Sequence, residues 1–199
     1  MALTPSTMLP LGTPAPDFHL PAANPSVDDR GDGLTRRLAD YADARALVVV
    51  FTCNHCPYVH AVEDRLIALA RETAARGVAF VAISANDADA YPADSFEAMA
   101  ARAAEKGYPF PYLYDETQAV ARAYDAACTP DFYLFDDVRR LVYRGRLDDG
   151  RPGRPPTTTD LADAIAATLD GRKPAATQHP SMGCSIKWKR APAEARADR

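Results

Sequence analysis

Residues 46–60, ALVVVFTCNHCPYVH, decide the fold of this chain. The first six form a continuous apolar run rich in β-branched side chains. Such a run is typical of a strand buried on both faces, in a sheet that lies between layers of helices. Cys53 and Cys56 follow the strand, and Pro57 then suits the first position of a helix, where its missing N–H costs nothing. The stretch therefore predicts a strand, a short turn carrying two cysteines, and a helix.

The pattern continues outward from this stretch in both directions. Apolar residues at helical spacing predict a helix from Pro57 to residue 76, with Gly77 as its stop, and residues 78–85 predict a second buried strand. A strand–helix–strand unit with short connections is parallel and right-handed. Upstream, we predict a short strand at Phe18–Leu20 and a polar loop or hairpin over residues 21–37.

The elements predicted after this unit complete one domain. They are a helix from Asp94, with Glu97 in a capping box, to Lys106; an extended piece at 109–115; a helix at 116–126; a hairpin that pairs 132–135 with 141–146; and a helix from Thr158 or Thr159 to Leu169. This order predicts an α/β fold with a central mixed β-sheet flanked by helices. We divide the chain into a loose leader (1–11), a domain (12–170) and a basic tail (171–199).

Composition sets the protein class and the charge. The 199 residues suffice for one well-buried domain with extensions, and the net charge is −4. Residues 171–199 carry seven Lys/Arg against two Asp/Glu, which we interpret as a solvated, partly ordered extension. Nothing in this balance indicates nucleic acid as a partner.

The N-terminal residues resemble neither a signal peptide nor a membrane anchor. They have no basic start, proline interrupts them repeatedly, and no apolar run in the chain approaches ~20 residues. We therefore expect a cytoplasmic protein with no membrane association. In that compartment stable disulfides are rare, so cysteines close in sequence are expected to be catalytic or metal-binding.

Cys56 is the best candidate nucleophile. Ligand chemistry in an open α/β sheet gathers where strands end and helices begin, and Cys56 sits at that place. Free N–H groups at a helix start stabilise a thiolate, which is the reactive form. His55 could add charge or a proton. Cys53, three residues upstream, is close enough to act as a resolving thiol on oxidised Cys56.

Two other interpretations of this stretch stay open. Cys53, His55, Cys56 and His60 are ligands that zinc accepts, but one short segment seldom surrounds an ion, so we expect no metal and regard His60 as a helix-surface residue. The cysteines could also be small buried side chains in a redox-inactive interaction domain.

Three motifs now point to a family. They are GTPAPDF at 12–18, FTCNHCPYV at 51–59 and CTPDFYLFD at 128–136. Together they resemble the thioredoxin-like superfamily in its AhpC/TSA, peroxiredoxin-like branch, over about residues 12–170. The resemblance implies a thioredoxin-like fold and a thiol–disulfide oxidoreductase without organic cofactor, recycled by a thiol reductant. In this superfamily the attacking cysteine stands five residues after a phenylalanine of the motif. Counted from Phe51, that position is Cys56. Thr129-Pro130 resembles the family's cis-proline pair, which faces the attacking sulfur and, with His55 and Pro57, implies a substrate groove.

The chain departs from the peroxidase pattern at two positions. Cys53 stands where peroxiredoxins keep a threonine, and Pro130 stands where they keep an arginine. We therefore expect a disulfide as the substrate, with peroxide as the alternative. Cys128 is either a thiol at the rim of the site or a buried structural residue. Cys184, in a tail with Trp188 as a docking anchor, is the alternative resolving thiol. The sequence leaves the oligomeric state open, a homodimer included.

Overall fold

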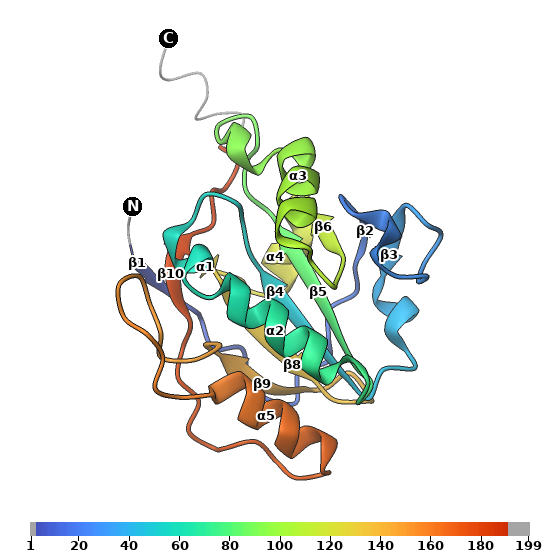
Figure 1. Cartoon of the computed structure of the whole chain (residues 1–199), viewed down its shortest axis with the longest axis vertical. Coiled ribbons are helices and arrows are strands. Elements are labelled where there is room, and N and C mark those ends of the chain that lie inside the picture. The colour runs from blue at the N-terminus through green and yellow to red at the C-terminus, as the bar shows by residue number, and fades with distance from the viewer. Residues whose placement is uncertain (1–2, 191–199) are drawn as a thin grey trace.

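The computed structural model describes residues 3–190, and a five-stranded mixed sheet forms its centre (Figure 1). The sheet has the strand order β6-β5-β4-β8-β9, in which β4, β5 and β6 are parallel and β8 and β9 are antiparallel to their neighbours. The strands are β4 (Ala46–Phe51), β5 (Val78–Ser84), β6 (Tyr112–Tyr114), β8 (Asp131–Phe135) and β9 (Leu141–Gly145).

Helices pack on both faces of this sheet. The helices are α1 (Pro57–His60), α2 (Glu63–Ala74), α3 (Phe96–Lys106), α4 (Ala119–Ala123) and α5 (Asp160–Leu169), with 3-10 turns η1 (Pro25–Val27), η2 (Leu38–Tyr41) and η3 (Pro92–Asp94). One core cluster lies under α2, α3 and α5, and a second lies under η2 and α4. Every residue of β4 is buried between them. This confirms the strand predicted at residues 46–51 and the helix-covered mixed sheet.

The helix predicted over residues 57–76 is broken into α1 and α2. Between them, the N–H of Val62 bonds to the carbonyl of Val59, a three-residue step that tightens the turn, before α2 starts. The helix predicted from Asp94 begins at Phe96, and its cap is Ser95, whose side chain accepts from the Ala98 N–H. The capping box at Asp94 and Glu97 is therefore wrong. The helix predicted at 116–126 is formed only at α4.

The upstream segment forms a hairpin of β2 (His19–Pro21) and β3 (Thr35–Arg37). Of the two predicted forms, loop and hairpin, the structure has the hairpin. Part of this polar segment is buried, although we expected only a loop or hairpin outside the core. Arg36 is fully buried, with its guanidinium 2.7 Å from a carboxylate oxygen of Asp28.

Both ends of the described chain meet in a second small sheet. Strand β1 (Leu3–Pro5) pairs with β10 (Met182–Ser185), which pairs in turn with β7 (Cys128–Thr129). Figure 1 shows β1 and β10 side by side next to α1. The expectation of a loose leader is wrong at β1, because β1 pairs with β10, and the expectation of a solvated tail is wrong at β10, because β10 pairs with β7. Residues 171–180 of the tail are mostly exposed, as expected. Residues 191–199 of the predicted tail lie outside the described residues.

Within residues 3–190, no helix combines the length and apolar character needed to cross a membrane.

Candidate active site

The turn between β4 and α1 places Cys56 against the start of a helix. Cys56 has extended backbone and is the N-cap of α1, and Pro57 is the first helical residue, as the sequence predicts. Strand β4 is fully buried up to Phe51, so the turn that follows begins inside the protein. As a result Cys53 and Cys56 are buried rather than displayed on the surface.

Three of the four cysteines form one cluster. Cys53, Cys56 and Cys184 pack together with Val59, and the partly buried Tyr58 packs against them. All four cysteines of the chain are free thiols in this structure. The tail brings Cys184 to the cluster because it lies opposite Thr129 in the β10–β7 pair.

Thr129 and Pro130 line the site beside these thiols. The sulfur of Cys53 lies 3.3 Å from the hydroxyl oxygen of Thr129. The sulfur of Cys56 lies 3.2 Å from the Thr129 carbonyl oxygen, to which Cys56 donates when it is protonated. The peptide bond between Thr129 and Pro130 is cis. Cys128, directly before this pair in β7, is buried, and its thiol donates to the Pro130 carbonyl at 3.7 Å.

The surroundings lower the pKa of Cys56. The main cause is a hydrogen bond from the Cys53 thiol to the Cys56 sulfur, opposed by burial, and further donors are the Cys184 thiol, the Cys184 N–H and the Val59 N–H. Because α1 spans only four residues, these individual donors, more than a helix dipole, hold the thiolate.

The other three thiols are shifted in the opposite direction. Its hydrogen bond to Cys56 and then its burial raise the pKa of Cys53. Burial, followed by the bond to Cys56, raises the pKa of Cys184 to about 11. Burial also raises the pKa of Cys128. Cys56 is therefore the thiol that ionises most readily, while the neighbouring Cys53 and Cys184 keep their protons.

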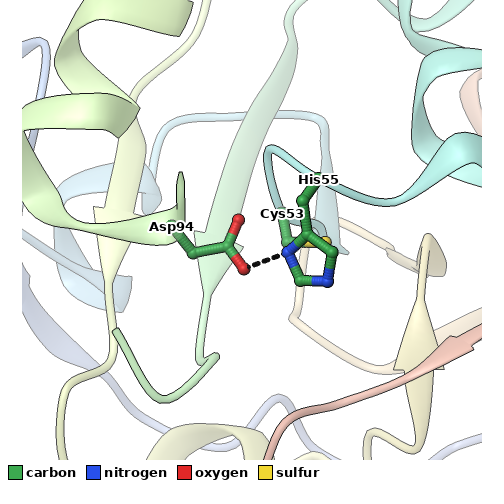
Figure 2. A group of neighbouring side chains, drawn as sticks. All are labelled: Cys53, His55 and Asp94. Atoms are coloured by element: carbon green, nitrogen blue, oxygen red, sulfur yellow. Dashed lines mark hydrogen bonds and ion pairs between the residues drawn. The ribbon is translucent and has the colours of Figure 1, made fainter. Parts of the chain in front are cut away.

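Asp94 holds the turn from the side. Figure 2 shows its carboxylate meeting the imidazole of His55, with an Oδ2–Nδ1 distance of 2.6 Å. The same buried carboxylate accepts from the Asn54 N–H and from the side chain of Asn86, each at 2.7 Å. The His55 ring also stacks on Tyr91 with 5.4 Å between ring centroids. His55 is thus fixed beside Cys53.

Two supporting residues lack a local sequence signal for these roles. In the sequence Asp94 fits a helix cap, but in the fold its carboxylate contacts His55, which lies 39 residues earlier in the chain. His60 was expected to be an ordinary surface residue; it is exposed, yet its Nε2 lies 2.5 Å from the Asn54 carbonyl and ties α1 to the turn. Only the tertiary arrangement identifies either one.

The ligand set that the fold assembles differs from the one considered from sequence. Among the described residues, Cys53, His55 and Asp94 place one potential ligand atom each within 4.8 Å of one another. Cys56 and His60 are not part of that group. In this group Asp94 replaces Cys56, which the metal-site interpretation of the sequence had included.

A cavity of about 170 Å³ adjoins the site. Tyr58 and Pro130 line one part of it, and Ser181 and the loop that carries Arg146 and Asp148 line the rest. Tyr58 also packs on the thiol cluster, although no cysteine lines the cavity itself.

Comparison with known proteins places this geometry in context. A model described as the AhpC/TSA family matches residues 11–144. No curated protein matches the sequence. The crystal structure of an uncharacterized conserved protein from Geobacillus kaustophilus has 51% identity and a TM-score of 0.89, covering 96% of this chain and 98% of its own.

Two further solved structures show how far the similarity extends. A hypothetical protein from Sinorhizobium meliloti 1021 has 45% identity and a TM-score of 0.88, covering 94% of this chain and 100% of its own. A putative thiol:disulfide interchange protein DsbE from Chlorobium tepidum has 20% identity and a TM-score of 0.57, covering 81% and 99%. The last similarity shows the fold alone.

Proposed function

The chain belongs to the AhpC/TSA family of thioredoxin-like oxidoreductases, and we propose that it is a thiol–disulfide oxidoreductase whose attacking group is Cys56. One observation carries the proposal: Cys56 is the N-cap of α1 and packs against Cys53, beside the cis Thr129-Pro130 pair. The lowered pKa of Cys56, for which Cys53 is the main hydrogen-bond donor, agrees with this geometry. A low-pKa thiolate beside a protonated thiol is the arrangement that disulfide exchange needs.

The reaction runs in two exchanges. The Cys56 thiolate attacks a disulfide RS–SR, forming a Cys56–SR mixed disulfide and releasing RS⁻. Cys53 then loses its proton to the released thiolate and attacks the Cys56 sulfur, which expels the second RS⁻ and leaves a Cys53–Cys56 disulfide. The substrate gains two electrons from the enzyme. A thiol reductant then supplies two electrons that reduce the Cys53–Cys56 disulfide again.

The raised pKa of Cys53 suits this order. Its main cause is the hydrogen bond to the Cys56 sulfur. That cause disappears once Cys56 is bonded to the substrate, because the negative charge has left its sulfur. The hydroxyl of Thr129 then helps Cys53 to lose its proton, because its hydrogen bond to the Cys53 sulfur lowers the pKa of Cys53. Cys184 also donates to Cys56, and it is the alternative resolving thiol.

Disulfide mapping after mild oxidation tests the assignment. We expect bis(2-hydroxyethyl) disulfide to convert the chain into a form with a Cys53–Cys56 bond, detected by mass spectrometry of peptides. Cys53→Ser should divert the bond to Cys56–Cys184, and Cys56→Ser should abolish both. If Cys56 joins no disulfide and forms no sulfenate in the wild-type chain, the proposed mechanism is wrong.

The alternative enzyme activity is a thiol-dependent peroxidase. The Cys56 thiolate would attack a hydroperoxide, forming a sulfenate and an alcohol, and a neighbouring thiol would release water to give the disulfide. Membership of the AhpC/TSA family supports this reading. Stopped-flow oxidation with hydrogen peroxide distinguishes the two: rapid, stoichiometric loss of the Cys56 thiol favours the peroxidase.

A metal-binding function is the second candidate. The grouping of Cys53, His55 and Asp94 within 4.8 Å favours it, and these ligand types suit zinc. Both carboxylate oxygens of Asp94 already accept hydrogen bonds, from Asn54, His55 and Asn86, which favours the redox function instead. Zinc titration of the reduced protein by calorimetry tests it, with His55→Asn as the variant expected to lose binding.

A further inference from the structure

The attacking thiol is completely covered. Cys56 has 0% exposure, and its neighbours Cys53 and Cys184 have 2% and 3%. A disulfide must bring one sulfur into contact with the Cys56 sulfur. The residues that cover Cys56 therefore decide which disulfides can react.

The chain itself occupies the sheet edge beside Cys56. Strand β10 pairs antiparallel with β7, so that Cys184 lies opposite Thr129 and Ser185 opposite Cys128. Thr129 is the residue whose carbonyl contacts the Cys56 sulfur. An extended polypeptide binds a protein by adding a strand to a free edge. At this edge the backbone groups of Thr129 are already taken.

Gly183 makes the contact too close for any other residue. A Cβ at this position would lie 2.0 Å from the Thr129 carbonyl oxygen and 3.2 Å from the Pro130 nitrogen. Both neighbours are backbone atoms, which cannot move aside as a flexible side chain would. The glycine is thus required by space, and it lets β10 lie directly on the Thr129-Pro130 pair.

The segment that follows β10 is firmly attached to the body. We call residues 182–189 the strap. The Lys187 N–H donates to the Asn86 side chain at 2.8 Å, and the Gln118 side chain bonds both the Lys187 carbonyl, at 2.9 Å, and the Lys189 N–H, at 2.8 Å. The guanidinium of Arg122 lies 4.4 Å from the centre of the Trp188 ring. On its other side, β1 pairs with the strap.

We propose that the strap is a built-in occupant of the groove along β7, which restricts the enzyme to low-molecular-weight disulfides and excludes disulfides of polypeptides. This inference rests on the proposed function. A small disulfide does not need the edge of β7, and the cavity of about 170 Å³ lined by Tyr58 and Pro130 gives it space next to Tyr58, which packs on the thiol cluster. The exchange steps are those given above, with R a small group.

Gly183→Ala tests the proposal because the added methyl group pushes the strap off Thr129. The wild-type chain should reduce bis(2-hydroxyethyl) disulfide and leave insulin disulfides nearly untouched. In Gly183→Ala we expect insulin reduction to rise by about tenfold or more, with a much smaller change for the small disulfide. Ser185→Ala, on the same strand but adding no atoms, is the matched control.

Two further measurements keep the test decisive. Trp188→Ala removes the anchor of the strap without placing an atom in the groove, so it should raise insulin reduction in the same direction even if Gly183→Ala does not fold. Alkylation of Cys56 by a polyethylene-glycol maleimide, compared with iodoacetamide, reports access without any turnover. The large reagent should react slowly with the wild-type chain and faster with both variants.

The outcomes separate the strap from the chemistry. If the wild-type chain reduces insulin, or reacts with the large maleimide, as fast as the variants do, the strap does not close the groove and the inference is wrong. If the maleimide rates differ as expected but neither disulfide is reduced by any variant, the groove is closed and the proposed function fails, together with the substrate class.

Discussion

Cys56 receives hydrogen bonds from several directions at the start of α1. Cys53 approaches from the turn, Cys184 from the strap, and the Val59 N–H from the helix itself. Burial alone would raise the pKa of a thiol, as it does for Cys128. The donors at Cys56 outweigh that effect, so the pKa of buried Cys56 falls while the pKa of buried Cys128 rises. At this scale the pKa of a buried thiol depends on its hydrogen-bond donors and not on burial alone.

Replacing Cys53 by alanine should raise the pKa of Cys56. The native value is lowered mainly by the donor that this change removes, so the thiolate will form only at higher pH. The pH profile of Cys56 alkylation by iodoacetamide measures this shift: the wild-type midpoint should lie well below the midpoint of Cys53→Ala. Cys128→Ala, which removes a thiol that is not a donor to Cys56, should keep the wild-type midpoint. Equal midpoints in all three proteins would contradict the assignment.

The turn between β4 and α1 is the element that carries the site, and it is held by residues outside it. Asp94, at the end of η3, accepts three hydrogen bonds from Asn54, His55 and Asn86. His60 closes the turn from within α1. Because the carboxylate is fully buried, the loss of any acceptor leaves a buried donor without a partner.

Asp94→Asn should therefore weaken the protein and loosen the turn. An amide has one acceptor oxygen in place of two, which should lower the free energy of unfolding by about 1–3 kcal/mol. Urea unfolding measures the loss. Asp89→Asn, at an exposed position a few residues earlier, should change it by less than about 0.5 kcal/mol. A similar effect of both changes would show that Asp94 does not support the turn.

At the scale of the whole molecule, a buried ion pair links the two antiparallel strands next to the site. The guanidinium of Arg144 on β9 lies 3.1 Å from the carboxylate of Asp131 on β8, and both side chains are shielded from solvent. Arg144 also lies 4.5 Å from the centre of the Tyr133 ring. Burial raises the pKa of Asp131 to about 6, although Arg144 opposes the rise. Arg144 thus offsets part of the free-energy cost of burying the charged carboxylate of Asp131.

Arg144→Met should lower the free energy of unfolding by about 3–5 kcal/mol at neutral pH, because it leaves Asp131 buried without its partner. Without Arg144 the pKa of Asp131 rises further. A folded-state pKa above the unfolded value stabilises the fold at low pH and loses that contribution as pH rises, so the variant should be less destabilised at acidic than at neutral pH.

Urea unfolding at the two pH values checks this prediction. Arg172→Met, at an exposed pair with Asp170, is the control and should cost no more than about 1 kcal/mol. An Arg144→Met defect that does not shrink on acidification would mean that Asp131 is not the group responsible.

Local patterns in the sequence were sufficient for the central architecture. The apolar run of β4, the second strand β5, the β8–β9 hairpin and the position of Cys56 before Pro57 were all predicted from composition and periodicity. These features depend on residues near one another in the chain, because a buried strand must be apolar throughout and a helix start tolerates proline.

The surroundings of Cys56 were decided only by the tertiary structure. The carboxylate of Asp94, the strand pairing of β10 with β7, and the ordering of both terminal segments join residues far apart in the chain. No local periodicity encodes such contacts, since each satisfies backbone or side-chain groups that become buried only when the whole chain is folded. The sequence alone was enough to propose Cys56 as the attacking thiol; only the fold shows that this cysteine is buried and that β10, from the chain's own tail, packs beside it.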